Sequence, residues 1–441
     1  MRAAEDVASF LATEARPDRG VIARGAARNY GDAAQNEGGD VLDMTGLDRI
    51  LWVDAERRLA RAQAGATVAQ LIARLAMDGL TLPVVPGTRH VTIAGAIASD
   101  IHGKNHHRDG GMARHVVSMA ICTPAGGMLE VTPESDPEQF YATLGGMGLT
   151  GVVVEATLAV EPLLSPWVAA DIDRTDGLAG TLELMGAEER HRYSVAWLDM
   201  LAAGARMGRA VISQADPMPA GAGAPRRGRW RARGHDHPAG ITRGPLIDVP
   251  RGVPGSLLQP AAVRSFNALY WRASPRRERG RPVALAPYFF PLDVLGAWNR
   301  LYGQGGLLQY QLVIPSGRER ELEACFELIR GRRLPVYLAV FKRFGPEFGG
   351  PLSFPLAGWT LAIDMPAAAP GLRRALDDLD ELVVAAGGRV YLTKDVRLRR
   401  DVLPAMYPQL ARFRAQRTRV DPDGLLRSDL GRRLGLCGGG E

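Results

Sequence analysis

The chain has 441 residues, of which 46% are hydrophobic and 23% are charged, and it is too long to form one small core. No apolar run approaches the roughly 18–20 residues that cross a bilayer. The three cysteines are isolated, which argues against a disulfide framework and against a cysteine-based zinc site. The composition therefore predicts a globular protein of two domains.

The net charge of +6 is unevenly distributed along the chain. Much of the excess lies in residues 225–244 and 272–282, which are rich in Pro, Gly and Arg. Neither stretch lies in a nucleic-acid fold motif, so we interpret both as exposed loops and expect no nucleic-acid partner. The N-terminal stretch MRAAEDVASFLATEARPD is amphipathic and carries acids, unlike a signal peptide. We therefore expect a cytoplasmic protein with peripheral membrane association.

The first third of the chain predicts alternating strands and short helices. Residues 18–53 follow the pattern of a strand, a tight loop and further strands. An amphipathic helix is expected from Thr67 to Met77, with Gly79 at its end. A helix of small residues is expected at 93–99, and residues 115–133 have the pattern of a β-hairpin.

The pattern changes near Pro162, where a second unit begins. Before this point, residues 136–163 predict a short helix, a glycine-rich turn and a long strand. Residues 214–260 show little periodicity and are predicted to be a long loop. After this loop, residues 283–388 again show the periodic patterns of strands and helices. Strands are expected at LLQYQLVIP, PVYLAVFKRFG and GWTLAIDMP, and amphipathic helices at GRERELEACFELIRG and GLRRALDDLDELVVAAGG.

Two loops place glycines where the backbone can approach a ligand closely. They are ARGAARNYGD, residues 23–32, and PGTRHVTIAGAIASDIHG, residues 86–103. Backbone N–H groups in such loops can bind phosphate oxygens. Neither loop has the spacing of a Rossmann fingerprint or of a P-loop, and each alone is equally consistent with an ordinary turn.

Together with the later turn GGMGLTG, these loops resemble the flavin-binding domain of the vanillyl-alcohol oxidase (PCMH-type) superfamily. The segments SVAWLDM, FKRFG, PLSFPLAGW, GGRVYLTKD and VDPDGLLRSDLGRRL extend the resemblance over nearly the whole chain, to the decaprenylphosphoryl-β-D-ribose 2′-oxidase family of arabinan and cell-wall synthesis in actinobacteria. The resemblance implies an α+β fold in two parts. The FAD-binding domain would comprise residues 1–165 and be completed by 389–441. The substrate-binding cap domain, 166–388, would be an antiparallel sheet flanked by helices, with mobile basic loops near 214–260 and 272–282.

The same resemblance implies which residues hold the cofactor, FAD. The expected contacts are Ala23, Arg24, Gly25, Ala26, Ala27, Arg28, Asn29, Tyr30, Gly31, Gly87, Thr88, Thr92, Gly95, Ser99, Ile101, His102, Val154 and Tyr391. Some relatives tether FAD through a histidine in the first loop. The first loop of this chain has no histidine, so FAD is expected to bind non-covalently.

The stretch DIHGKNHH, residues 100–107, holds three of the chain's eight histidines and one of only three lysines. The resemblance places it where the flavin meets the substrate, and it implies a catalytic role for His102 near the sugar and the isoalloxazine ring. For His106 and His107, a core position and a functional role remain equally open. No acid is spaced with these histidines as in a zinc or iron site, so no metal is expected.

Lys394 in VYLTKD matches the active-site lysine of the family. A lysine near a flavin can hydrogen-bond a substrate hydroxyl and, when neutral, accept its proton. Gln309 and Gln311 alternate with Tyr310, so both amides share one strand face and suit a polyhydroxylated sugar. The resemblance adds further substrate contacts at Lys342, which would meet the phosphate diester or the sugar, and at Tyr30, Phe289 and Thr360.

Two departures from the family pattern fall near the expected substrate. The chain reads FFPLD where the family usually reads HPLD. Thr360, Leu361 and Ala362 occupy the positions at which mycobacterial members carry Asn-Val-Cys. The reactive cysteine of that family is therefore absent, and inhibitors that trap it are not expected to form a covalent adduct.

The implied function is FAD-dependent oxidation of a sugar secondary alcohol to a ketone. The implied substrate is decaprenylphosphoryl-β-D-ribose, oxidised at its 2′-hydroxyl, or a close polyprenyl-phosphate pentose. This is the first half of an epimerisation that an NAD(P)H-dependent ketoreductase partner completes. The alternative is an oxidase of the same fold that acts on a soluble sugar, alditol or nucleoside. A flavin-binding protein without catalysis is disfavoured by Lys394, His102 and the glutamine pair.

Overall fold

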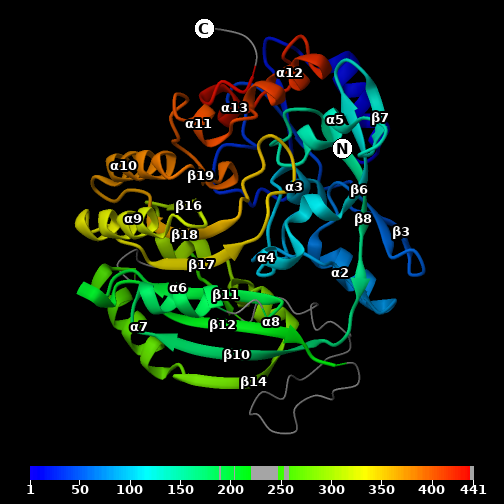
Figure 1. Cartoon of the computed structure of the whole chain (residues 1–441). Helices are drawn as coiled ribbons and strands as arrows, with labels where there is room; N and C mark the ends of the chain where they lie inside the picture. The colour runs from blue at the N-terminus through cyan, green and yellow to red at the C-terminus, as the bar shows by residue number, and fades with distance from the viewer. Residues whose placement is uncertain (188–189, 203, 220–246, 253–257, 438–441) are drawn as a thin grey trace.

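Two large β-sheets, each with helices packed beside it, form most of the described structure, and three two-stranded sheets accompany them (Figure 1). The structure is a computed structural model, and it describes all residues except 188–189, 203, 220–246, 253–257 and 438–441. In Figure 1, the elements of the first sheet, blue to cyan, lie to the upper right of the second sheet, green to orange. About a third of the chain is helical and more than a quarter is in strands, consistent with the α+β class.

The first sheet has five strands in the order β3-β4-β8-β6-β7. The neighbouring strands pair antiparallel throughout. As expected from the sequence, residues 115–133 form a hairpin and a long strand follows the glycine-rich turn. The strands are β3 (Ile50–Asp54), β4 (Leu59–Gln63), β6 (Val116–Thr123), β7 (Gly127–Val131) and β8 (Val152–Ala159).

The predicted helix after β4 is confirmed as α2 (Val68–Met77). Thr67 caps it, because its hydroxyl accepts the N–H of Gln70 while the Gln70 side chain reaches back to the Thr67 N–H. The helix of small residues is α3 (Ile93–Ala98), which Thr92 caps in the same way through the N–H of Gly95. The remaining elements of this part are α1 (Ala4–Ser9), η1 (Phe10–Glu14), β1 (Val21–Arg24), β2 (Asp40–Asp43), β5 (Leu80–Thr81), α4 (His106–Asp109), η2 (Met112–His115), α5 (Pro137–Thr143) and β9 (Glu161–Pro162).

The second sheet has eight strands in the order β14-β10-β12-β11-β17-β18-β16-β19. Each pair of neighbouring strands in this sheet is antiparallel, as the resemblance implied for the cap sheet. Its strands are β10 (Trp167–Thr175), β11 (Tyr193–Asp199), β12 (Arg209–Pro217), β14 (Arg277–Ala284), β16 (Leu307–Pro315), β17 (Leu338–Phe344), β18 (Gly358–Pro366) and β19 (Arg389–Val390).

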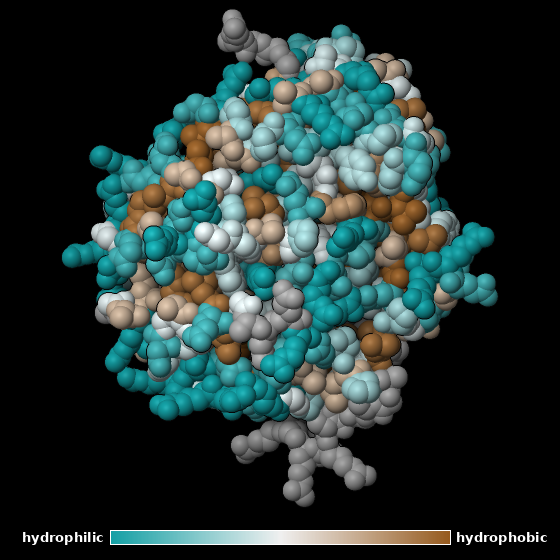
Figure 2. Space-filling model, in the orientation of Figure 1, coloured by the Kyte–Doolittle hydropathy of each residue, from teal (hydrophilic) through white to brown (hydrophobic). Residues whose placement is uncertain are grey.

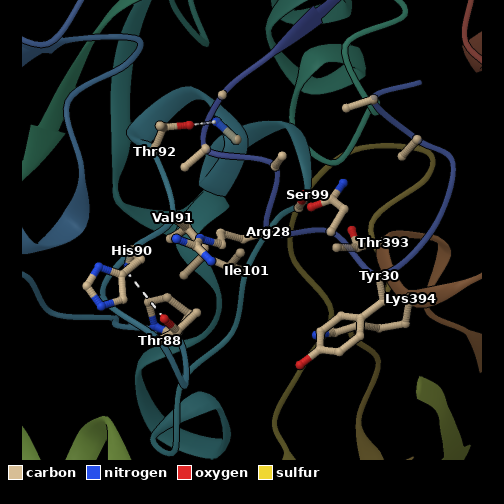
Figure 3. Close-up of a pocket in the computed structure, with 18 of the residues that line it drawn as sticks. Arg28, Tyr30, Thr88, His90, Val91, Thr92, Ser99, Ile101, Thr393 and Lys394 are labelled. Atoms are coloured by element: carbon tan, nitrogen blue, oxygen red, sulfur yellow. Dashed lines mark hydrogen bonds between the residues drawn. The ribbon is translucent and has the colours of Figure 1, made fainter. Parts of the chain in front are cut away.

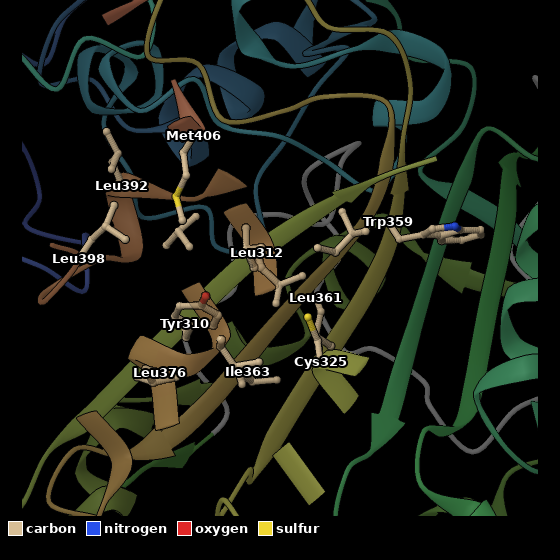
Figure 4. Packing of buried hydrophobic residues seen from close by; sticks show 14 of the residues in the cluster. Tyr310, Leu312, Cys325, Trp359, Leu361, Ile363, Leu376, Leu392, Leu398 and Met406 are labelled. Atoms are coloured by element: carbon tan, nitrogen blue, oxygen red, sulfur yellow. The ribbon is translucent and has the colours of Figure 1, made fainter. Parts of the chain in front are cut away.

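One face of this sheet packs against helices to form the largest apolar core (Figure 4). Leu312, Leu361 and Ile363 project from the central strands into this core, and Phe341 and Trp359 stack with ring centres 5.3 Å apart. The predicted helices are confirmed as α9 (Glu319–Gly331) and α10 (Leu372–Ala385), and α6 (Leu178–Ala187) packs beside them. Because side chains alternate along a strand, the opposite face is left free to line a site.

The remaining segments of the cap are short, apart from one helix. This helix, α7 (Pro260–Ala273), is tied to β11 by a hydrogen bond of 3.0 Å from Asn267 Nδ2 to Asp199 Oδ1. The others are η3 (Gly204–Arg206), β13 (Ile247–Asp248), α8 (Leu285–Phe289), η5 (Pro291–Val294), β15 (Leu295–Gly296) and η6 (Trp298–Tyr302).

The C-terminal segment returns to the first unit. After β19, it forms η7 (Leu392–Lys394), α11 (Leu403–Met406), α12 (Leu410–Val420) and α13 (Asp429–Arg433). Val21 donates its N–H to Leu425 O at 2.8 Å, and α12 contacts α5. Residues 389–390 belong to the cap sheet by their pairing with β16, although the resemblance assigned them to the FAD-binding domain. The division of the chain into domains otherwise stays a prediction.

The prediction of a basic loop at 272–282 was wrong. Most of this segment forms β14, which pairs with β10 at one edge of the large sheet. An edge strand needs backbone partners on one side only, so its charged side chains can remain in solvent and its Pro282 is tolerated. Of the loop expected at 214–260, residues 220–246 and 253–257 lie outside the described residues, while β12 extends to Pro217.

Candidate active site

A cavity of about 930 Å³ lies between the two loops of the first unit and the free face of the large sheet. This volume is at the upper end of the range for small-molecule sites. Figure 3 looks into the cavity and shows the second-loop residues Thr88, His90, Val91 and Thr92 on one side and Tyr30 of the first loop with Lys394 on the other. Most of the expected site residues line it: Ala23, Arg24, Gly25, Ala26, Ala27, Arg28, Asn29, Tyr30, Gly87, Thr88, Thr92, Gly95, Ser99, Ile101, His102, Gln309, Gln311, Lys342, Tyr391 and Lys394.

The first loop lines the cavity with residues 23–30 and carries backbone donors that have no protein acceptor. Among the described residues, no N–H from Ala26 to Gly31 donates to a protein acceptor. Ala27 has a φ of 50°, a left-handed conformation that is rare outside glycine and reverses the chain locally. A run of unpaired backbone amides forms a concave site for phosphate oxygens. The loop can therefore hold the diphosphate of a dinucleotide.

The second loop touches the first where glycine is required. A Cβ on Gly25 would lie 2.1 Å from Thr92 Oγ1, so a larger residue would push the loops apart. A Cβ on Gly87 would meet no atom within 4 Å, because this glycine borders the open cavity. The arginines Arg24 and Arg28 also line the cavity and add positive charge for an anionic ligand. The residues present thus fit a dinucleotide such as FAD.

Three central strands of the cap sheet supply the other wall. Gln309 and Gln311 on β16 both line the cavity, while Tyr310 between them donates its hydroxyl to Asp380 in the core. The predicted sharing of one face by the two glutamines is therefore confirmed. Lys342 on β17 stands directly opposite Thr360 on β18, which puts both side chains on this same face.

His102 is buried at the junction of the two units and uses both ring nitrogens. Its Nδ1 lies 3.0 Å from Lys342 Nζ, and its Nε2 lies 3.0 Å from Gln311 Nε2. Burial, and then the charge of Lys342, hold the pKa of His102 well below its ordinary value, so the imidazole is neutral. Burial, and then the charges of the nearby Lys104 and Lys394, lower the pKa of Lys342 to about 7.

Lys394 approaches the cavity from the C-terminal segment. Its Nζ lies 4.1 Å from the centre of the Tyr30 ring, and no described residue forms a hydrogen bond with this amine. Burial lowers the pKa of Lys394 to about 8, although the carboxylate of Asp364 acts in the opposite direction. Burial raises the pKa of Asp364, whose Oδ1 accepts a hydrogen bond from Gln309 Nε2. Lys394 is thus an amine that loses its proton near neutral pH.

The other residues of DIHGKNHH hold the structure together. Lys104 donates from Nζ to the carbonyl of Tyr288 and lies 4.2 Å from the centre of that ring, which ties the segment to the cap. His106 accepts the N–H of Gly345 at Nδ1, at 3.2 Å. His107 donates from Nε2 to His191 O at 3.0 Å. None of the three lines the cavity, and the contacts of His106 and His107 join the segment to residues of the cap.

Four expected site residues do not line the cavity. Phe289 is buried among apolar residues of the first unit and the cap, with its ring centre 4.9 Å from that of Tyr193. Thr360 is buried beneath Gln311 and bonds it. Val154 packs with Val152 in an apolar core that also holds Val7 of α1 and Val21 of β1. Gly31 lies against the backbone of Asp395.

Several lining residues were missed at the level of sequence. Leu338 and Val340 precede Lys342 at intervals of two and line the cavity beside it, so the alternation of the strand carried this information. No local sequence pattern predicted the contact between the second loop and the cap. Asp293 accepts the N–H of Arg89 at 2.9 Å, and its carboxylate lies 3.9 Å from His90 Nε2.

Comparison with known proteins agrees with this geometry. Residues 1–132 match the model of the FAD-binding domain family, so the chain carries an FAD-binding domain. The chain is 39% identical over 426 residues to decaprenylphosphoryl-beta-D-ribose oxidase of Mycolicibacterium smegmatis, an alignment that covers 95% of this chain and 90% of that protein.

Two further relatives mark the breadth of the likeness. A Streptomyces coelicolor protein from the mprA 5′ region is 38% identical over 359 residues, which cover 81% of this chain and 96% of that protein. L-galactono-1,4-lactone dehydrogenase 1 of Oryza sativa is 38% identical over 112 residues, but these cover only 25% of this chain and 19% of that enzyme. The likeness to the plant enzyme is thus partial, whereas the first alignment spans both proteins. The chain therefore belongs to the decaprenylphosphoryl-β-D-ribose oxidase family of FAD-binding proteins.

Proposed function

We propose that this protein oxidises the 2′-hydroxyl of decaprenylphosphoryl-β-D-ribose, or of a close polyprenyl-phosphate pentose, to a ketone. The observation that carries the proposal is the arrangement of the cavity. First-loop residues whose backbone amides have no protein acceptor line the same cavity as Lys394, Gln309 and Gln311. The full-length likeness to the mycobacterial oxidase supports the choice of substrate.

FAD, when bound, supplies the acceptor for the hydride that leaves the carbinol carbon. The residues of the chain must then take the hydroxyl proton and hold the sugar. Lys394 suits the first task, because its amine has no hydrogen-bond partner among the described residues and its pKa is lowered to about 8. A neutral amine can accept the proton as the carbon–oxygen double bond forms.

Gln309 and Gln311 suit the second task. Gln311 directs both N–H groups of its amide at Thr360 and His102, and Gln309 donates one to Asp364. The two amide oxygens and the second N–H of Gln309 are left to match neighbouring hydroxyl groups of a pentose. Tyr30 borders the same space, with its ring centre 6.4 Å from that of Trp298, and gives the sugar or the flavin an aromatic wall. His102 contributes by holding Lys342 at the cavity, 3.0 Å away.

We further propose that FAD is bound without a covalent tether. The first loop offers no histidine or cysteine to a flavin, and the described histidines that line the cavity are His90 and His102. Of these, His102 has both ring nitrogens engaged by protein groups. Acid precipitation of the holoprotein tests this directly: free FAD in the supernatant is expected, and a yellow pellet would contradict it.

The substrate is tested by anaerobic reduction of the flavin. Farnesylphosphoryl-ribose should bleach the flavin absorbance, while ribose, ribitol and uridine at the same concentration should not. Bleaching by the soluble compounds alone would indicate the alternative, an oxidase of free sugars, alditols or nucleosides. A protein that takes up no FAD would overturn the proposal entirely.

A ketone product calls for a second enzyme if the net reaction is inversion at C2′. We propose an NAD(P)H-dependent ketoreductase partner for this step. Incubation with substrate alone should accumulate ketone. Addition of such a reductase with NADH or NADPH should convert the ketone to the arabino epimer.

A lipid-linked substrate also calls for access to a membrane surface. No helix in the described part of the chain is both long and apolar enough to cross a bilayer. On α7, Phe266 is 61% exposed and Leu269 is 68% exposed, with exposed arginines on the neighbouring β14. On the face shown in Figure 2, hydrophobic residues are scattered among hydrophilic ones. We propose peripheral contact, in which α7 meets anionic lipid. Cosedimentation with phosphatidylglycerol vesicles should be weakened by F266E/L269E, and unchanged binding would contradict this.

A further inference from the structure

One hydrogen-bond chain behind the cavity fixes the positions of its protons. It begins at Thr360 on β18, whose hydroxyl lies 2.8 Å from Leu312 O. A carbonyl can only accept, so the single hydroxyl proton of Thr360 must point to Leu312. The Thr360 oxygen is therefore left to accept from its other partner, Gln311 Nε2, at 3.0 Å.

This contact fixes the orientation of the Gln311 amide. Its NH2 group faces Thr360, and the same nitrogen lies 3.0 Å from His102 Nε2. The amide nitrogen has two protons, and one is directed at each partner. His102 Nε2 must then accept, which leaves the ring proton of this neutral imidazole on Nδ1.

The last member of the chain is Lys342, whose Nζ lies 3.0 Å from His102 Nδ1. Because Nδ1 carries a proton, Lys342 must accept through the lone pair of a neutral amine. An ammonium would place two donors face to face. A neutral Lys342 agrees with its pKa, which burial and then the charges of Lys104 and Lys394 lower to about 7.

The charged and titratable groups that act on this pair come from several elements. Lys104 and His106 lie on the segment and helix that follow His102, and Lys394 lies on η7. All of them disfavour a positive charge on His102 or Lys342. His106 is itself neutral, because burial lowers its pKa to about 3.

We propose that Thr360 is a positioning residue, which fixes the Gln311 amide, holds His102 as its Nδ1–H tautomer and keeps Lys342 a neutral amine. With its lone pair engaged by His102, Lys342 retains two N–H donors for the cavity. It is thus a donor to a sugar oxygen and neither the proton acceptor nor a phosphate-binding cation. Lys394, whose amine has no described partner, keeps its lone pair for the hydroxyl proton. The tautomer is independent of the substrate, whereas the two lysine roles rest on the proposed function.

The tautomer is tested by nitrogen NMR of the FAD-loaded protein labelled with 15N-histidine, with the His102 signals assigned by their loss in H102Q. At pH 8.5 the wild-type protein and T360S, which keeps the hydroxyl, should both show a protonated Nδ1. T360V preserves the shape but removes the acceptor, so the Gln311 amide can rotate and the Nε2–H tautomer should appear. A wild-type Nε2–H tautomer would overturn the proposal. So would a T360V spectrum equal to that of wild type, or a T360S spectrum equal to that of T360V.

The pH dependence of substrate oxidation gives a second readout. In T360V, rotation of the amide lets His102 accept from a protonated Lys342, so the pKa of Lys342 should rise. The added positive charge on Lys342 should lower the pKa of the nearby Lys394, whose neutral form accepts the proton, so the low-pH limb of kcat/KM for farnesylphosphoryl-ribose should move to lower pH. An unshifted limb in a variant that binds FAD normally would contradict the proposal. If the wild-type protein does not oxidise this substrate, the proposed function fails while the NMR test of Thr360 still stands.

Discussion

The Nζ of Lys394 lies 4.1 Å from the centre of the Tyr30 ring, although 364 residues separate the two in the chain. The C-terminal segment brings the lysine back to the first loop, where the backbone amides are unpaired. A cavity that holds both an amine with a lowered pKa and anion-binding backbone amides suits hydride transfer from an alcohol to a bound dinucleotide.

Replacement of Lys394 should slow the chemical step without loss of the cofactor. K394A removes the proton acceptor, and general-base catalysis contributes roughly 10²- to 10⁴-fold, so anaerobic flavin reduction should slow by at least about 100-fold. K394R keeps a positive charge but cannot become neutral, and it should be as slow as K394A. Stopped-flow absorbance with farnesylphosphoryl-ribose measures both. A K394R rate near that of wild type would show that charge alone is needed.

The pH profile should report the proton on Lys394. The pKa of this amine is lowered to about 8, and only the neutral form accepts a proton, so kcat/KM should rise with pH through about 8. Asp364 stabilises the ammonium form, so D364N should lower the pKa of Lys394 and move the limb to lower pH. D401N removes an acid that is 71% exposed and should leave the limb in place. A shift to higher pH in D364N would contradict the assignment.

Cofactor binding should depend on the close contact of the two loops. A Cβ in G25A would lie 2.1 Å from Thr92 Oγ1 and would push the first loop away from the second. The Kd for FAD, measured by titration of the apoprotein, should rise by roughly tenfold or more. G331A adds a methyl group where no atom lies within 4 Å and serves as the matched control. An unchanged Kd in G25A would show that the loops do not hold the cofactor together.

A cysteine placed at position 362 should give the cavity a thiol that reacts with electrophiles. Ala362 lines the cavity, and Cys122 and Cys325 are buried elsewhere. Mass spectrometry after treatment with a thiol-specific electrophile should therefore show an additional adduct on A362C that the wild-type protein lacks. L361C places the thiol on the opposite face of β18, inside the core, and should not gain it. An equal adduct on both variants would contradict the assigned faces.

Local patterns in the sequence predicted much of this fold. The alternation of Gln309, Tyr310 and Gln311 identified the strand and the face that meets the cavity, because side-chain direction in a strand follows from parity alone. The amphipathic pattern of residues 67–77 likewise predicted α2, and the structure adds that Thr67 and Gln70 satisfy two free N–H groups at its start. Such signals lie within one turn or one strand.

Features that depend on distant partners could not be predicted in this way. Residues 277–284 have a charged, glycine-containing sequence with low strand propensity, yet they form β14 because β10 offers an unpaired edge. Phe289 and Thr360 occupy family positions beside the substrate, but their side chains turn into the protein. The series of hydrogen bonds from Thr360 to Lys342 joins three strands and one loop, so no single segment of the sequence carries a pattern that predicts it.

The most direct test of the central claim is a kinetic isotope effect on flavin reduction. Farnesylphosphoryl-ribose that carries deuterium at C2′ should bleach the flavin several-fold more slowly than the unlabelled compound in anaerobic stopped-flow experiments, because the C2′–H bond breaks in that step. The keto group should then be found at C2′ of the product. Equal rates for the two compounds, with oxidation at another carbon, would contradict the proposed reaction.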